Sequence, residues 1–219
     1  MSDSDQDFDL ALTAAAFRVA ADVGWERMTV ADAAREAGLS LAKARQRFPA
    51  RPAILRRFGE QLDQAALAVP PQDGPVRDRL FDLLMNRFEA MKPHREGLRA
   101  LLRALPRDPA AALELAGATR RGMRWMLNAA GQPTNGVLGT LRLHGLIAVW
   151  AWAARAFEKD ESEDLSATMA ALDTALGRAH EVASWLSGQG TRGVGSDASA
   201  SEALGPDALM GDEPAAPLT

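Results

Sequence analysis

The feature that most constrains the fold is a pair of helix start signals placed eleven residues apart. Thr29 and Ser40 are both N-cap residue types, and each precedes a short stretch of helix-forming residues. Gly38 separates the two stretches, as a glycine just beyond a helix end does. The spacing therefore predicts two short helices, over 30–37 and 41–48, in a helix–turn–helix arrangement.

The rest of the sequence repeats the same helical pattern. Apolar residues recur at spacings of three and four, and no stretch alternates strictly between apolar and polar residues. We therefore predict an all-α fold. Proline and glycine bound the further helices, which we expect over 8–23, 52–67, 76–92, 94–105, 109–129, 137–157 and 163–186.

Composition divides the chain into four parts. A Pro- and Gly-rich stretch at 69–75 reads as a linker, and the C-terminal end holds Gly, Ser, Ala, Pro and acids with little to bury. We expect a disordered acidic N-terminus over 1–7, a helix–turn–helix domain over 8–68, a helical bundle over 69–187 and a disordered tail over 188–219.

Chemistry-bearing motifs are missing from the sequence. There is no cysteine, which excludes disulfides and thiolate metal sites, and the three histidines lie far apart. The stretch GQGTRG at 188–193 matches a dinucleotide-binding pattern in letters, but no strand follows or precedes it. We expect no enzyme activity, no catalytic residues, no metal and no cofactor.

The start of the sequence is acidic rather than basic and apolar, so it does not resemble a secretory signal. The longest uncharged apolar run, GLIAVWAWAA, is shorter than the roughly 20 residues that a span needs. We expect a cytoplasmic protein without stable membrane insertion.

Positive charge gathers on and after the second short helix, although the net charge of the chain is −4. Residues 38–58 hold six cations and no acid. Lys and Arg pair with phosphates, Arg and Gln read base edges, and a helix N-terminus favours a phosphate. We predict contacts with double-stranded DNA from Thr29, Ser40, Leu41, Ala42, Lys43, Arg45, Gln46, Arg47 and Arg51. The alternative is a solvated basic face.

Residues 12–58 resemble the N-terminal DNA-binding domain of the TetR/AcrR family of transcriptional regulators. The shared pattern is a helix, a Gly-Trp turn, Thr29, the stretch AAREAGLS, a short helix ending at Phe48, and Pro-x-Arg. Arg45 stands where the family usually has an aromatic phosphate contact, and Arg51 replaces the family's lysine. The resemblance implies a homodimer that binds a palindromic operator, most often as a ligand-responsive repressor.

Residues 77–160 resemble a second group, the lipid-binding accessory proteins of ubiquinone biosynthesis, which share the TetR fold but do not work through DNA. This resemblance implies a lipid- or quinone-binding protein as the alternative function. The cations of 41–47 favour the regulator, because the accessory proteins have generally lost them.

In a TetR-like chain the C-terminal helices bind a ligand and a second subunit. An unknown small apolar ligand is expected against Trp and Met side chains, at Phe88, Met91, Leu102, Met123, Trp125, Met126 and Trp150. The helices over 137–157 and 163–186 resemble the dimer-forming pair, with contacts expected from Trp152, Leu165, Met169, Leu172, Leu176 and Val182. Core packing is the alternative for the large Trp and Met side chains.

Overall fold

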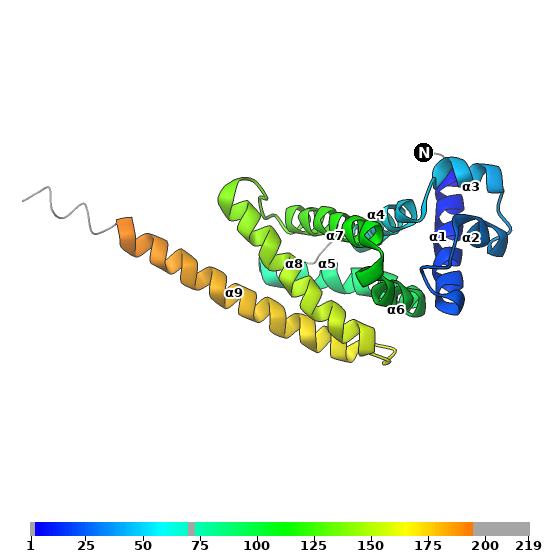
Figure 1. The fold of residues 1–219 in the computed structure, drawn as a ribbon. Coiled ribbons are helices and arrows are strands. Elements are labelled where there is room, and N and C mark those ends of the chain that lie inside the picture. Colours follow the sequence, from blue (N-terminus) through cyan, green and yellow to red (C-terminus); the bar gives the residue numbers. More distant parts are fainter. Residues whose placement is uncertain (1–2, 70–72, 195–219) are drawn as a thin grey trace, which may run out of the picture. The chain divides into compact units, whose positions relative to one another are not determined.

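The computed structural model describes residues 3–69 and 73–194, and side chains up to residue 184. Within these ranges every regular element is helical, as predicted (Figure 1). The α-helices are α1 Asp3–Val23, α2 Val30–Glu36, α3 Leu41–Arg47, α4 Arg51–Ala68, α5 Val76–Met91, α6 Arg95–Ala104, α7 Pro109–Ala129, α8 Gly136–Lys159 and α9 Ser166–Val194. Short 3-10 turns, η1 Lys92–His94 and η2 Leu105–Arg107, flank α6.

The helix–turn–helix forms where the cap residues predict it. Thr29 accepts a hydrogen bond from the Asp32 backbone, and the Asp32 carboxylate accepts one from the Thr29 backbone, which completes a capping box on α2. Ser40 caps α3 in the same way through the Lys43 backbone N–H. Gly38 has a φ of 65°, in the left-handed region that glycine adopts without strain. These contacts set the angle between α2 and α3.

An aromatic core holds α1 to α4. Phe17 of α1 packs against Phe58 of α4, with ring centroids 4.4 Å apart, and against Trp25, at 6.0 Å. Phe48, the residue that ends α3, is also fully buried. Phe48 and the buried Ala44 therefore fix one face of α3 to the core.

Helix α4 also packs along α5 and α7, and α1 packs against α6. The α1–α6 crossing is very close, because a side-chain carbon at Gly97 would collide with the backbone carbonyl of Phe17. Residues up to Ala179 form one compact unit, and the described residues from His180 onward fall outside it. The division at 68/69 remains a prediction, since α1 and α4 share a core with helices on both sides of it.

Two predicted disordered segments are partly helical. Residues 3–7 belong to α1, and residues 188–193, including GQGTRG, belong to α9. The N-terminal residues are held in the helix because Asp5 pairs with Lys43 on α3, a partner that composition does not reveal. Residues 1–2 and 195–219 lie outside the described residues.

Helix α8 is long and apolar enough to cross a membrane by length and composition alone, with a mean hydropathy of 1.4. The core helix of a water-soluble protein passes the same test. Leu143, Leu146, Val149 and Trp150 of α8 do pack into the core of this chain.

Candidate nucleic-acid interface and adjoining cavity

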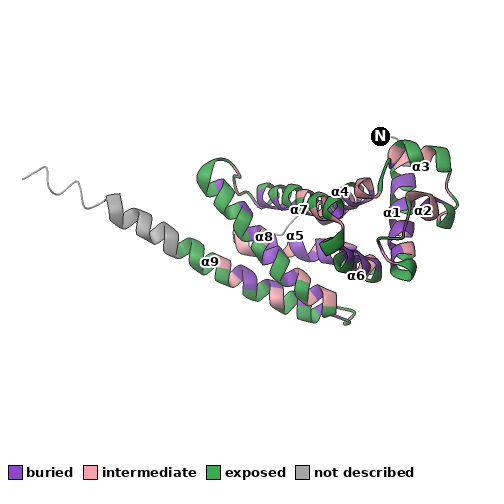
Figure 2. Cartoon of the chain, viewed as in Figure 1, coloured by how far each residue is buried: buried purple, intermediate pink, exposed green. Residues whose placement is uncertain are grey.

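The outer face of α3 is open to solvent. Ala44 faces inward and is buried, whereas Leu41, Ala42, Arg45 and Gln46 are exposed (Figure 2). Leu41 is a large apolar side chain with 47% of its surface exposed. The face therefore combines apolar and hydrogen-bonding groups on a single helix, which is the composition that base edges in a major groove require.

A buried carboxylate on α1 organises the cations next to this face. Asp9 is only 1% exposed, and its two oxygens accept hydrogen bonds from Arg47 Nε at 2.5 Å and Nη2 at 2.6 Å. Arg57 of α4 contacts the same carboxylate, with Nε at 3.0 Å. The hydrogen bonds that Arg47 donates to Asp9 hold the pKa of Arg47 above its ordinary value. Asp9 therefore ties α1, α3 and α4 together through charge-assisted hydrogen bonds.

A second acid of α1 lies at the surface of the same cluster. Asp5 Oδ1 is 2.7 Å from Lys43 Nζ, and Asp5 Oδ2 is 3.2 Å from Arg47 Nη1. The hydrogen bond from Lys43 lowers the pKa of Asp5 more than its slight desolvation raises it. Lys43 also lies over the ring of Phe8, 4.8 Å from its centroid. Lys43 therefore has partners on α1 before any DNA approaches.

Arg51 holds parts of the chain together. Its Nη1 donates to the backbone carbonyls of Trp25 and Glu26, at 2.8 and 2.7 Å, and its Nη2 is 3.4 Å from Asp108. These contacts fasten the turn after α1 and the start of α7 to α4. The Arg51 guanidinium, which was predicted to contact a phosphate, therefore already has acceptors within the protein.

Arg45 differs from the other cations of the cluster. Arg56 pairs with Glu114, at 3.1 Å. Among the residues that the structure describes, Arg45 alone of the six has no ion pair, and its Nη1 donates to the Pro49 carbonyl, at 2.9 Å. The other five cations have ion-pair partners outside 38–58, namely Asp5, Asp9, Glu60, Asp108 and Glu114.

The order and packing of these helices place the chain among known structures. It superimposes on the crystal structure of a TetR transcriptional regulator from Nitrosomonas europaea ATCC 19718 with a TM-score of 0.65 and 19% identity, covering 80% of this chain and 98% of that one. The chain has the TetR fold. A TetR transcriptional regulator from Rhodococcus sp. RHA1 aligns with a TM-score of 0.57 and 16% identity over 78% and 93% of the two chains. No protein-family model and no curated protein match the sequence.

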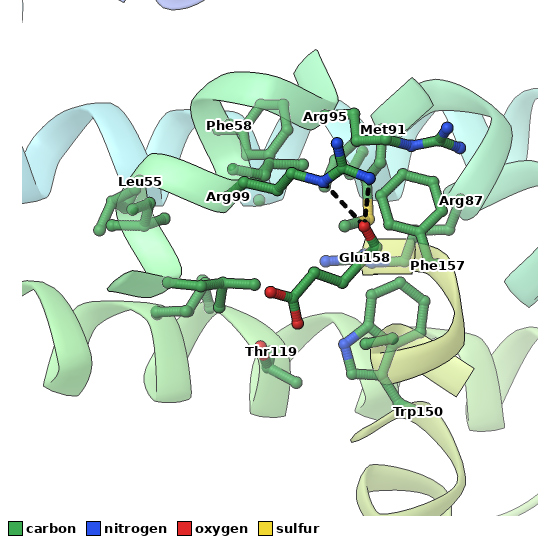
Figure 3. Close-up of a pocket in the computed structure, with 18 residues that line it drawn as sticks. Leu55, Phe58, Arg87, Met91, Arg95, Arg99, Thr119, Trp150, Phe157 and Glu158 are labelled. Atoms are coloured by element: carbon green, nitrogen blue, oxygen red, sulfur yellow. Dashed lines mark hydrogen bonds between the residues drawn. The ribbon is translucent and has the colours of Figure 1, made fainter. Parts of the chain in front are cut away.

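The TetR fold of this chain encloses a cavity of about 120 Å³ between α4, α5, α6, α7 and α8 (Figure 3). Apolar side chains make up most of its wall, including Leu55, Phe58, Leu62 and Phe157. The cavity is therefore apolar and of a size that accepts a ring or a short alkyl chain.

Three of the predicted ligand residues, Met91, Leu102 and Trp150, line this cavity. The other four lie elsewhere. Phe88, Met123 and Met126 are buried in the core, where Phe88 stacks on the Trp150 ring with centroids 4.3 Å apart. Trp125 is 60% exposed, because it sits two positions from Met123 and therefore points away from the buried face of α7.

The predicted dimer residues fall into two groups. Leu165, just before α9, and Leu172 and Leu176 of α9 are buried within this chain, so these side chains are covered by the chain's own helices. Trp152 and Met169 are exposed, at 50% and 41%, and Val182, beyond residue 179, is exposed as well. An apolar stripe shows that a helix face is covered, but it does not show which chain covers it.

Sequence reasoning missed Asp5 and Asp9 at the α3 face, and Arg87, Arg95 and Glu158 at the cavity. The acids of 1–10 were visible as a cluster opposite in sign to the cations of 43–57. That complementarity was the available signal for the first pair. The cavity arginines carried no comparable signal, because most arginines on helices are solvated.

Proposed function

We propose that this protein is a DNA-binding transcriptional regulator that contacts DNA through α3. The observation that carries the proposal is the exposed face of Leu41, Ala42, Arg45 and Gln46 on a doubly capped helix–turn–helix in a TetR fold. Ser40 at the start of α3 suits a phosphate, because the first N–H groups of a helix lack internal acceptors. Thr29, at the start of α2, suits a second backbone contact.

The residues proposed to contact DNA differ in whether they already have a partner within the protein. Arg45 and Gln46 are exposed and form no ion pair with any residue in the described ranges, so they make the primary contacts. Lys43 exchanges Asp5 for a phosphate. Arg47 and Arg51 act as positioning residues, because their guanidinium groups already hold α3 and α4 in place.

The regulator acts as a homodimer. Exposed apolar side chains on α8 and α9 support this, since a solvent-facing Trp and Met on two neighbouring helices mark a surface that another protein covers. Residues of this kind are Val137, Leu138, Leu141, Trp152 and Met169. A two-fold dimer presents two copies of α3, so the operator is an inverted repeat.

Regulation by a small ligand, in the sense of a repressor that releases DNA, is supported by the position of α6. One part of α6 lines the cavity through Leu98, Leu101 and Leu102, and another part crosses α1 at Gly97. A ligand that binds more tightly to one placement of α6 favours the matching placement of α1 and of the helix–turn–helix. The size of the shift is set by the difference in ligand affinity between the two placements.

Selection of bound fragments from genomic DNA tests the DNA-binding proposal. The expected result is one inverted repeat, bound with an affinity that falls with salt at a slope of about 0.9 per phosphate contacted. The Lys43→Ala/Arg45→Ala double variant should bind it much more weakly. The Arg120→Ala/Arg124→Ala variant removes the same charge from exposed positions on α7 and should bind like the parent. Equal binding by all three proteins would remove α3 as the contact surface.

The dimer has its own test. Trp152→Glu should shift the protein to a monomer in light scattering coupled to size-exclusion chromatography. Trp125→Glu makes the same change at another exposed tryptophan, on α7, and should leave a dimer intact. A dimer that survives Trp152→Glu contradicts the proposed interface.

The apolar cavity also supports the alternative, a lipid- or quinone-binding accessory protein that does not bind DNA. Extraction of the purified protein with organic solvent, followed by mass spectrometry, detects such a lipid. A bound lipid together with no fragment enriched in the DNA selection would favour the accessory protein over the regulator.

A further inference from the structure

The outer face of α3 exposes apolar surface among polar and charged side chains. Leu41 is 47% exposed, and Ala42 beside it is exposed as well. Leu39, two positions before Leu41, packs partly against the core, and Phe48 at the other end of the helix is fully buried. The apolar residues around α3 therefore divide into a set that fixes the helix to the core and an exposed pair, Leu41 and Ala42.

The neighbours of this pair distinguish it from an ordinary exposed leucine, because apolar side chains are common on protein surfaces. Leu41 and Arg45 lie one helical turn apart on the same side of α3, and Ala42 and Gln46 repeat this spacing on the adjoining side. All four side chains are exposed. The two apolar groups therefore share one surface with a guanidinium group and an amide, which bind phosphates and base edges.

The charge on this surface favours an anionic partner. Lys43 is paired with Asp5 of α1, and Arg47 is paired with Asp5 and Asp9. Arg45 forms no ion pair within the described ranges. A phosphate backbone that is attracted to Arg45 brings Leu41, on the same side of the helix, against the duplex. The exposed leucine then loses its contact with water.

The chemistry of the major groove limits what an apolar side chain can meet there. Base pairs present hydrogen-bond donors and acceptors in this groove, together with one methyl group, on C5 of thymine. A polar base edge that faces a leucine loses its water without gaining a hydrogen bond, which is unfavourable. A thymine methyl group has no hydrogen bond to lose, and its burial against a leucine is favourable. Leu41 on this surface therefore discriminates in favour of thymine.

We infer that Leu41, with Ala42 beside it, selects a thymine in each half of the operator through contact with the C5 methyl group. The inference rests on the DNA-binding function proposed above and extends it from binding to the choice of base. Burial of one methyl group is worth about fourfold in affinity. The same contact is made twice in a two-fold dimer, once by each copy of α3.

Deoxyuridine in place of thymidine tests the contact without a change in the protein. Uracil keeps the hydrogen-bonding groups of thymine and lacks only the methyl group. The full-length protein is titrated, by fluorescence anisotropy, with the selected operator and with operators that carry uracil at one thymine position of both half-sites. At one position the affinity should fall by roughly fifteenfold, since each of the two lost methyl contacts is worth about fourfold.

Three variants assign the effect to Leu41. Leu41→Ala removes most of the exposed apolar surface and keeps a strong helix former at the first position of α3. It should bind the thymine and uracil operators within about twofold of each other. Gln46→Ala should weaken both operators by the same factor, because an amide discriminates through hydrogen bonds that uracil retains. Leu113→Ala makes the same substitution at an exposed position on α7 and should behave like the parent.

The inference is overturned if the parent binds thymine and uracil operators equally at every position, or if Leu41→Ala keeps the parent's preference for thymine. A Leu41 that contacts another protein instead of DNA gives the second result. The comparison of operators with the parent protein alone keeps the inference testable if Leu41→Ala fails to fold. Each of these results requires an operator and so leaves the DNA-binding proposal in place. A selection that enriches no sequence removes both.

Discussion

Arg47 and Asp9, which lie 38 positions apart in the sequence, form a bidentate ion pair with nitrogen–oxygen distances of 2.5 and 2.6 Å. The pair joins the last turn of α3 to α1, and the ion pair between Arg57 and Asp9 connects α4 to the same carboxylate. The direction in which α3 presents its exposed face therefore depends on one buried carboxylate.

Replacing Asp9 with Asn should destabilise the protein by about 3 kcal/mol, because it leaves two arginines without their buried partner. Chemical denaturation monitored by circular dichroism measures the loss. Asp5→Asn is the matched control, since Asp5 is a more exposed acid of the same helix and its removal should leave the unfolding midpoint nearly unchanged. Equal midpoints for Asp9→Asn and the parent would show that Asp9 does not hold α3 in place.

Asp5→Asn should affect DNA binding instead. The substitution frees Lys43 from its ion pair and removes a negative charge from the DNA-facing side of α1. Affinity for the operator should rise a few-fold at low salt, because Lys43 no longer has to leave an ion pair and the phosphates no longer approach the Asp5 charge. Asp22→Asn removes an exposed acid at the other end of α1 and should bind like the parent. Fluorescence anisotropy over a salt series compares the three proteins, and unchanged affinity with Asp5→Asn contradicts a role for Lys43.

The sequence was sufficient to predict the helices whose ends are set by local chemistry. Thr29, Ser40 and Pro109 act within one turn of their own position, and α2, α3 and α7 begin where these residues predict. The Asp9–Arg47 pair depends instead on how α1 crosses α3, which no local pattern contains. The opposite charges of 1–10 and 43–57 were visible in the sequence, but which acid pairs with which cation was not.

The crossing of α1 and α6 gives a further prediction. Gly97→Ala should destabilise the protein by about 1–3 kcal/mol, because the added methyl group meets the Phe17 backbone, which cannot move as a side-chain end can. Gly117→Ala on α7 is the control. Its methyl group would approach only the tip of Arg121, and the gain in helix propensity should make it neutral or stabilising. Thermal unfolding distinguishes the two, and a Gly97→Ala protein as stable as Gly117→Ala would mean that the crossing is loose.

His94 predicts a pH dependence. The imidazole packs between Phe17 and Phe58, with ring centroids 5.6 and 5.3 Å away. Burial, and then the positive charge of Arg18, lower its pKa below the ordinary value of 6.5. The unfolded chain therefore takes up the proton first as pH falls, so stability is full above about pH 6.5 and declines below it until the folded pKa is reached.

Unfolding midpoints measured between pH 8 and pH 5 test this dependence. In His94→Gln the decline that begins near pH 6.5 should disappear, whereas His144→Gln, at an exposed position, should retain it. Identical pH profiles for the parent and His94→Gln would assign the decline to other groups.

The tryptophans show why candidate sites are harder to predict than helices. Trp150 and Trp152 lie two positions apart on α8, and helical geometry requires them to point in different directions. It does not determine which one faces the core. The structure buries Trp150 against Phe88 and leaves Trp152 half exposed. The position of α5, which carries Phe88, therefore determines which tryptophan is buried.

Helix α4 presents Arg57 to the buried Asp9 on one face, and on another face it presents Leu55, Phe58 and Leu62, which form part of the cavity wall. A fragment cut after residue 68 would retain that wall and lose everything that faces it. Its apolar side chains would meet water and favour self-association. The isolated helix–turn–helix domain is therefore a poor substitute for the intact protein in DNA-binding experiments, which should use the whole chain.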